Sequence, residues 1–290
     1  MSFWIVTDAC GDLPASYLQK QERLLVAPMS YQMDGGIQEI HPLSPTAEAD
    51  SHTFYQRLMA GSNATTFQIN EQSWLELLSP LLERGEDVLA LVFSSGLSGT
   101  YEACRLAVEK LRARYPERKI FAVDSLCASL GQGLFVHHVL TRRDAGMGFD
   151  EAARWALDNR KKIIHWFTVD DLMFLKRGGR VSATSAAFGT MLKIKPVLHV
   201  DDEGHLIPME KVQGRKRSIK ALLEKAREVD LSGQAVFISH ADCPEDAQWL
   251  ADKLRAELGV QEILINTISP IIGSHTGQGT VALFYMAEKR

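Results

Sequence analysis

One stretch of the sequence constrains the fold of this chain most. It is an apolar run that ends in serines and glycines just before a helical pattern begins. Residues 88–93 are continuously apolar and too short for a buried helix, which predicts a buried parallel strand. Residues 94–99 predict a turn, and apolar residues recur at helical spacing over 101–115. Free N–H groups at that helix start would favour an anion, with Ser98 as the N-cap. Taken alone, the stretch is more typical of an ordinary strand, turn and capped helix.

The same order of strand, polar loop and helix recurs through the first half of the chain. Such a repeat predicts a parallel α/β sheet whose ligands sit beyond the carboxyl ends of its strands. The predicted strands cover residues 3–8, 24–31, 88–93 and 119–124, and the predicted helices cover residues 44–60, 70–83, 101–115, 126–141 and 149–159. The sequence therefore predicts an N-terminal α/β domain over residues 1–159.

The pattern changes near residue 160. Two apolar runs flank a turn at residues 201–204, which predicts an antiparallel pair of strands over 194–200 and 205–212. The other predicted strands cover residues 163–169, 234–240, 262–267 and 280–286, and the predicted helices cover residues 170–176, 184–191, 218–229 and 244–258. We therefore expect a C-terminal α/β domain with a mixed sheet over residues 160–290.

The composition argues against several classes of protein. With 290 residues, 46% of them hydrophobic, the chain is long enough for two domains with cores of their own. A formal net charge of −4 gives no general attraction to nucleic acid or to anionic membranes. The four cysteines lack the spacing of zinc sites and disulfide frameworks, and no apolar run approaches the length of a membrane span. We expect a cytoplasmic protein with no metal site, no nucleic-acid partner and no integral membrane contact.

Two further polar segments are candidate parts of a site, because loops at strand ends usually carry function. Thr66 lies in a polar cluster after a turn, and His275 lies in a predicted loop between Gly273 and Gly277. A histidine in such a loop can bond a carboxylate or accept a proton. The chain has nine histidines, so only this glycine-rich setting and the other polar loops favour His275 over the rest.

Arg180 follows two glycines, Gly178 and Gly179, in a basic segment between two predicted helices. One interpretation is a basic helix end with a glycine stop, for which the helix dipole is sufficient reason. The other is that the glycine bend aims Arg180 at a carboxylate or a phosphoryl group, whose oxygens a guanidinium can fork onto. The spacing is not that of a P-loop, so direct ATP binding is not implied.

Catalytic chemistry has little support in the sequence. The serines of residues 94–99 do not stand in the spacing of a nucleophile elbow, and no acid is evident that would complete a triad with His275. Asp8 and Asp124 stand at strand ends and could bind a cation, but such aspartates often only cap loops. We therefore predict no catalytic and no metal-ligating residues.

The motifs taken together resemble those of the DegV family over essentially the whole chain. The matching motifs stand at residues 7–13, 66–69, 94–101, 175–182, 195–196 and 275–279. The resemblance implies two α/β domains that hold one long-chain fatty acid between them, with no cofactor. It also implies that Thr66, Ser98 and His275 bond the carboxylate and that Arg180 lies near it. Some family members present the fatty acid to a separate kinase that makes the acyl phosphate.

The chain departs from the family pattern at several positions. Ala9 and Cys10 replace the usual serine of the first motif, and Phe67 and Ile69 replace serine and proline after Thr66. Gln213 stands where some members that serve the kinase carry an arginine, which weakens the expectation of a kinase partner. The alternative function is an enzyme, a hydrolase or transferase, that acts on an acyl or phosphorylated small molecule with Arg180 and His275.

Overall fold

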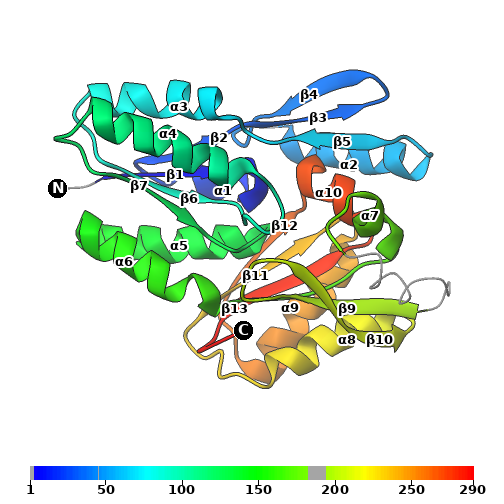
Figure 1. The fold of residues 1–290 in the computed structure, drawn as a ribbon. Coiled ribbons are helices and arrows are strands. Elements are labelled where there is room, and N and C mark those ends of the chain that lie inside the picture. Colours follow the sequence, from blue (N-terminus) through cyan, green and yellow to red (C-terminus); the bar gives the residue numbers. More distant parts are fainter. Residues whose placement is uncertain (1–2, 45, 182–193) are drawn as a thin grey trace.

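Two α/β units lie against each other in the computed structural model, which describes residues 3–44, 46–181 and 194–290. Figure 1 shows the N-terminal unit at upper left and the C-terminal unit at lower right. The helix predicted over residues 184–191 lies outside the described residues.

The N-terminal unit is built on a four-stranded parallel sheet. Its strands, in spatial order, are β2 (Leu24–Ala27), β1 (Trp4–Asp8), β6 (Val88–Val92) and β7 (Ile120–Asp124). Every residue of β6 is buried, as the continuous apolar run predicts. Helices cover both faces (Figure 1): α3 (Glu71–Glu83) and α4 (Thr100–Arg114) lie on one, α5 (Leu130–Asp144) and α6 (Phe149–Asn159) on the other.

This half also contains a second, antiparallel sheet, of which the sequence predicts only a turn and a short extended return over residues 33–40. Its spatial order is β4 (Gly36–Ile40), β3 (Met29–Met33) and β5 (Ala64–Phe67), and the helix α2 (Ala47–Met59) packs on it through the rings of Tyr31 and Phe54. The single strand predicted over residues 24–31 is wrong, because the chain leaves the parallel sheet at Pro28, which has no N–H for a ladder. The predicted loop at Thr66 is likewise wrong, since Thr66 lies within β5.

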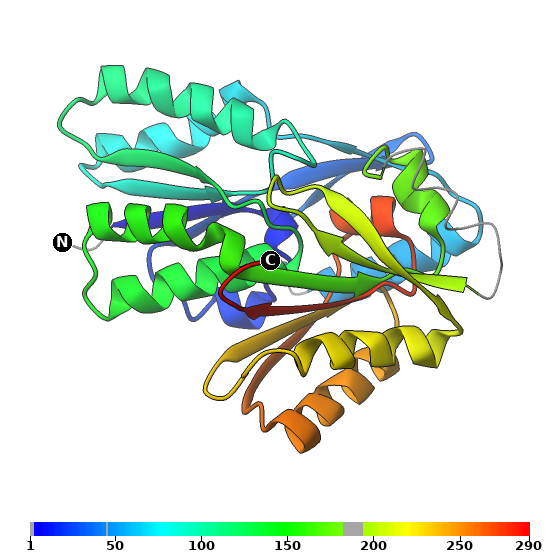
Figure 2. The ribbon, with the colours of Figure 1, turned by 60° about the horizontal axis from the view of Figure 1, so that its bottom comes forward.

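The C-terminal unit is a six-stranded mixed sheet. Its spatial order is β10 (Leu206–Gln213), β9 (Ile194–Val200), β8 (Ile163–Thr168), β13 (Val281–Met286), β11 (Ala235–His240) and β12 (Glu262–Thr267). Only β11 and β12 pair in parallel, and the predicted antiparallel pair is confirmed as β9 and β10. One face carries α8 (Arg215–Ala226) and α9 (Pro244–Leu258), seen below the sheet in Figure 2. The predicted fold class is therefore confirmed, while the exact boundary at residue 160 stays a prediction.

Helix α5 lies between the two sheets and joins the units. Its side chains Leu134, Phe135, Val136 and Val139 are fully buried. A Cβ atom at Gly131 would lie 2.2 Å from Nε2 of His165 on β8, so only glycine allows this close approach. The close packing of α5 against β8 thus explains why residue 131 is a glycine.

Short elements complete the chain around this junction. They are η1 (Ala9–Gly11), α1 (Ala15–Leu18), η2 (Arg160–Lys162), α7 (Leu172–Arg177) and α10 (Pro270–Thr276). The predicted loop at His275 is wrong, because His275 lies in the last turn of α10. Pro270 at the first helical position and Gly277 at φ +74° after the last one delimit this short helix.

Candidate functional site

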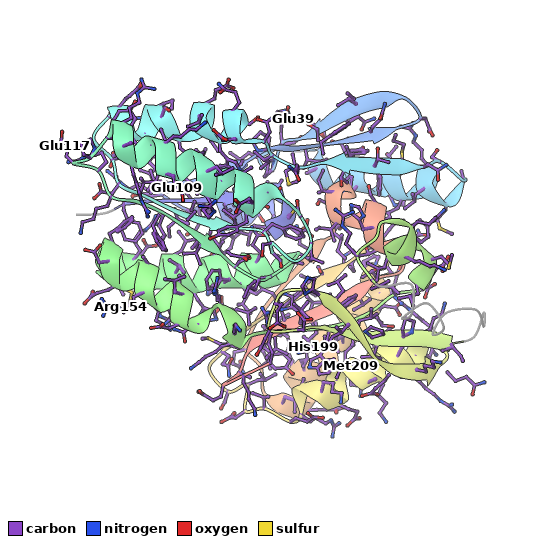
Figure 3. All side chains as sticks on the ribbon, in the orientation of Figure 1. Glu39, Glu109, Glu117, Arg154, His199 and Met209 are labelled. Carbon is purple, nitrogen blue, oxygen red and sulfur yellow. The ribbon has the colours of Figure 1, made fainter. Side chains whose placement is uncertain are left out.

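A cavity of about 360 Å³ lies between the two units, and residues of both line it. Its size is in the range of small-molecule sites. Among the described residues that line it, Arg180 is the only one with a permanent charge, and none is Asp or Glu. In contrast, Glu109, Glu117 and Arg154, which Figure 3 labels on the outside of the N-terminal unit, are exposed. The cavity is therefore apolar with a single cation.

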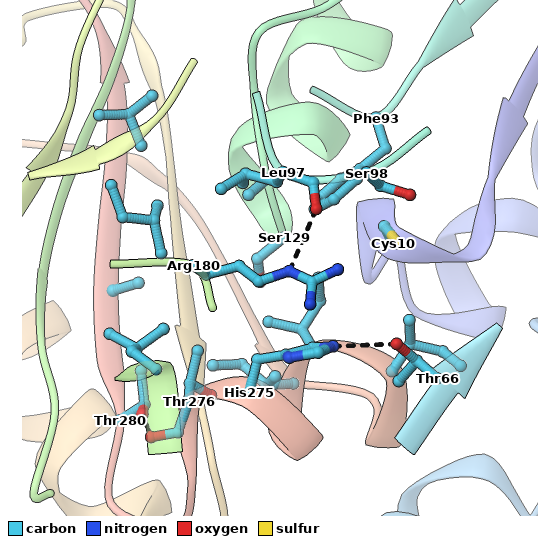
Figure 4. A pocket seen from close by; sticks show the side chains of 18 of the residues that line it. Cys10, Thr66, Phe93, Leu97, Ser98, Ser129, Arg180, His275, Thr276 and Thr280 are labelled. Atoms are coloured by element: carbon cyan, nitrogen blue, oxygen red, sulfur yellow. Dashed lines mark hydrogen bonds between the residues drawn. The ribbon is translucent and has the colours of Figure 1, made fainter. Parts of the chain in front are cut away.

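Thr66 and His275 meet at one end of this cavity. Oγ1 of Thr66 on β5 lies 2.9 Å from Nε2 of His275 on α10, although 209 positions separate them in the sequence (Figure 4). The second ring nitrogen, Nδ1, is buried and has no hydrogen-bond partner among the described residues. Both residues could be named as candidates from the sequence, but their contact with each other could not be predicted from it.

Arg180 reaches the same end from the segment after α7. Its Nε donates to the carbonyl of Leu97 at 3.1 Å, and its Nη1 donates to the carbonyl of Gly178 at 2.5 Å. In Figure 4 the guanidinium lies between Ser98 on one side and the pair of Thr66 and His275 on the other. Arg180 has no ion-pair partner in the part of the chain that the structure describes. Its charge is thus held in place by carbonyl groups and left without a counter-charge.

Ser98 lines the cavity at the start of α4. The predicted N-cap is wrong by one position, since Gly99 is the N-cap and α4 begins at Thr100. Oγ of Ser98 nevertheless accepts from the backbone N–H of Thr100 at 3.3 Å and lies 3.0 Å from Oγ1 of Thr100. The structure therefore brings all four predicted site residues to one cavity. We call this group, Thr66, Ser98, Arg180 and His275, the polar end.

The electrostatics of the polar end follow from burial. Burial and the nearby charge of Arg180 lower the pKa of His275 to about 4, so the imidazole is neutral at pH 7. Burial also lowers the pKa of Arg180, which remains charged because an arginine starts so high. The polar end therefore presents one positive charge and several neutral hydrogen-bonding groups.

The other side of the cavity is an apolar wall on the C-terminal sheet. We call this group the apolar wall; it consists of Phe167, Val200, Leu206, Ala282 and Phe284. Phe167 pairs with Ala282 and His165 pairs with Phe284 across β8 and β13, so alternate residues of these strands face the cavity.

His165 lies beside this wall without making it polar. Nε2 of its ring lies 3.2 Å from the backbone nitrogen of Ala128, and Nδ1 lies 3.0 Å from the carbonyl oxygen of Ile163. Burial holds its pKa well below the usual range. A neutral ring with both nitrogens bonded to the backbone is compatible with an apolar ligand.

Sequence reasoning missed most of the residues that line the cavity, His165 and Ser129 among them. The period-two alternation of residues 163–167 could have placed His165 on the same face as Phe167. Ser129 has φ +52°, a conformation that is uncommon outside glycine, and its Oγ donates to a carboxylate oxygen of Asp12 at 2.6 Å. No sequence signal marks that conformation.

The arrangement gives little support to hydrolysis or metal chemistry. Ser94 is fully buried, and its hydroxyl donates to the carbonyl of Gly204 at 2.9 Å, so it is not presented as a nucleophile. Within residues 3–44, 46–181 and 194–290, no group of three or more His, Cys, Asp or Glu side chains could hold a metal ion. In the same part of the chain, no helix has the length and apolar character needed to cross a membrane.

A family model and a relative of known sequence both match this chain to the same family. The model of the DegV family, described as uncharacterised protein, DegV family, matches residues 2–288. A DegV domain-containing protein of Clostridium perfringens is 40% identical over 99% of this chain and 98% of its own length.

Two solved structures of similar fold are described as fatty-acid-binding proteins. A DegV family protein from Thermus thermophilus, described by its fatty acid binding, superposes with a TM-score of 0.86 at 27% identity, over 99% of this chain and 100% of its own. A Thermotoga maritima protein said to reveal a fatty acid binding function superposes with a TM-score of 0.84 at 28% identity, over 99% of both chains. From the family match and the C. perfringens relative, this chain belongs to the DegV family.

Proposed function

We propose that this protein binds one long-chain fatty acid in the cavity between its two units. The observation that carries the proposal is Arg180, the single uncompensated cation among the described residues that line the cavity, none of which is an acid. An anionic head group supplies the missing charge, and a long apolar tail suits the opposite wall. The fatty acid binding described for the T. thermophilus and T. maritima relatives supports the same ligand class.

The carboxylate is proposed to lie at the polar end. Thr66 and Ser98 offer hydroxyl groups, His275 supports the Thr66 hydroxyl through Nε2 of its neutral ring, and Arg180 offers the charge. Each methylene of the tail that leaves water contributes about 0.8 kcal/mol, so a chain of sixteen carbons is held mainly by its tail. The head group then sets the orientation and the preference for an acid.

The protein is proposed to hold the fatty acid without converting it. The neutral His275 has Thr66 as its partner at Nε2 and no acid beside it to orient it as a general base. An enzyme that uses Arg180 and His275 on acyl or phosphorylated compounds is the alternative. Incubation with acyl esters and acyl phosphates separates the two, because turnover that is lost in His275→Ala would support the enzyme.

Native mass spectrometry of the purified protein tests fatty-acid binding itself. We expect one added mass in the range of a C16 to C18 acid, which exchanges with added palmitate. The protein stripped of lipid should take up palmitate but much less hexadecanol, whose head group is uncharged. If no acyl mass is present and palmitate is not taken up, the proposed function is wrong.

A separate fatty-acid kinase is the partner that the family resemblance predicts. Gln213, at the end of β10, is exposed and carries no charge where some kinase-serving members have arginine. We propose that any such partner meets the protein weakly at this position, and that Gln213→Arg strengthens the contact. Formation of acyl phosphate on addition of a kinase subunit and ATP tests this proposal. If neither the wild type nor Gln213→Arg yields acyl phosphate, the proposal is wrong.

A cytoplasmic location stays a prediction.

A further inference from the structure

Two neighbouring glycines, Gly178 and Gly179, differ in the reason why a side chain is absent. Gly179 has φ +70°, and a Cβ atom there would meet nothing within 4 Å, so its backbone conformation alone favours glycine. Gly178 has φ −70° and ψ −10°, which any residue can adopt. A Cβ atom at Gly178, however, would lie 2.4 Å from Nδ1 of His275. Position 178 therefore favours glycine because a side chain there would collide with the ring of His275.

The contact falls on the part of the ring that has little freedom to move. Nδ1 is bonded directly to Cγ of His275, and a Cβ atom at Gly178 would also lie 3.3 Å from that Cγ. Moving Nδ1 away requires a rotation about the side-chain bonds, which carries Nε2 away from Thr66. The distance of 2.9 Å between Nε2 and Oγ1 of Thr66 thus depends on Gly178.

The lack of a partner at Nδ1 decides which ring nitrogen carries the proton. Nδ1 is buried without a partner among the described residues, and the N–H of Gly178 donates to the carbonyl of Phe174 rather than to the ring. A buried N–H without an acceptor is among the costliest and rarest arrangements in proteins. A neutral ring therefore keeps its proton on Nε2 and donates it to Oγ1 of Thr66. The hydroxyl hydrogen of Thr66 is then free to point at a ligand.

We propose that Gly178 is a positioning residue for the head group of the ligand. Its missing side chain lets the His275 ring lie against the backbone with the proton on Nε2, and this directs the Thr66 hydroxyl hydrogen toward the carboxylate. The proposal rests on the proposed fatty-acid binding, but the state of the His275 ring can be measured without any ligand.

The test compares Gly178→Ala with Gly148→Ala. Gly148 has φ −74°, and a Cβ atom there meets only a carboxylate oxygen of Glu151 at 3.9 Å, so it controls for the general effect of the substitution. We expect Gly178→Ala to weaken palmitate binding about fivefold, the value of one hydrogen bond, and Gly148→Ala to leave it unchanged. In a His275→Ala background, Gly178→Ala should have no further effect, because the ring it displaces is gone. Equal weakening in both backgrounds overturns the proposal.

Nitrogen-15 NMR of the ligand-free wild-type protein tests the ring directly. We expect the His275 ring to show a protonated Nε2 and an unprotonated Nδ1, and the shifts to change in Gly178→Ala. A proton on Nδ1 in the wild type overturns the proposal, even where Gly178→Ala fails to fold. If the wild type takes up no palmitate while the ring is as expected, the proposed function fails and the role of Gly178 in placing His275 stands.

Discussion

The two ends of the cavity are assembled in opposite ways. The polar end draws Thr66, Ser98, Arg180 and His275 from four segments that are distant in the sequence. The apolar wall comes from neighbouring strands of one sheet, where alternate residues face the same side. Orientation and charge at the polar end therefore depend on how the two units pack, whereas the wall depends on the regular geometry of one sheet.

The comparison also separates affinity from selectivity. Burial of a tail contributes about 0.8 kcal/mol per methylene, while a hydrogen bond to a charged group contributes about 1.5 to 3 kcal/mol. A change at the wall should thus affect the binding of every long-chain ligand. A change at the polar end should affect acids and leave neutral analogues nearly untouched.

The largest effect is expected at the wall, from Ala282→Phe. Ala282 is 5% exposed and pairs with Phe167, so a phenyl ring there occupies space that the tail needs. Displacing about four methylenes weakens palmitate binding about 200-fold. Isothermal titration with palmitate and with octanoate checks this, because the shorter acid should lose much less. Equal losses for both acids would show that the wall does not hold the tail.

Arg180→Gln is expected to have the next largest effect. Loss of the only permanent charge among the described lining residues should weaken palmitate binding about 30-fold and leave hexadecanol binding unchanged. Arg177→Gln is the control, because Arg177 is exposed and its guanidinium lies over the Phe174 ring. Titration of both variants with palmitate and with hexadecanol measures the two effects. An equal loss for the alcohol would mean that Arg180 supports the fold rather than the head group.

Thr66→Val is expected to have a smaller effect. It removes one hydroxyl without changing the size of the side chain, which should weaken palmitate binding about fivefold. Thr65→Val is the matched control, since Thr65 is the adjacent, exposed residue of β5. Fluorescence displacement by palmitate compares the two variants. The assignment of Thr66 to the head group is wrong if both variants bind alike.

The smallest effect is expected from pH between 6 and 8. The folded-state pKa of His275, about 4, lies below the ordinary value of 6.5, so the ring stays neutral throughout this interval. Because the pKa of His275 is lower in the folded protein than in the unfolded chain, its neutral ring contributes stability above pH 6.5. That stability is lost as the pH falls toward 4. The dissociation constant of palmitate should change less than about twofold from pH 6 to 8. A steep tightening toward pH 6 would mean that a protonated His275 pairs with the carboxylate.

Regular parts of the fold could be predicted because their signals are local. The apolar run of β6, the turn after it and the helical spacing of α4 all lie within one stretch of sequence. The hairpin of β9 and β10 is marked in the same way by two apolar runs around a turn. Each of these elements is recognised without knowledge of its neighbours.

Other parts could not be predicted because their signals are tertiary. The glycines around His275 predict a loop, yet Gly273 lies within α10, where a Cβ atom would lie 2.4 Å from the hydroxyl oxygen of Tyr55. Thr66 stands in a strand because β3 offers its free edge, which the short polar cluster does not reveal. The residue types of the candidate site were visible in the sequence, but their distances depend on the packing of both units.

A crystal structure of the protein with palmitate tests the central claim most directly. We expect the carboxylate oxygens within about 3.2 Å of the Thr66 and Ser98 hydroxyls and of Arg180, with the tail against the apolar wall. A carboxylate at the wall, or a ligand outside the cavity, would contradict the assignment of the two ends.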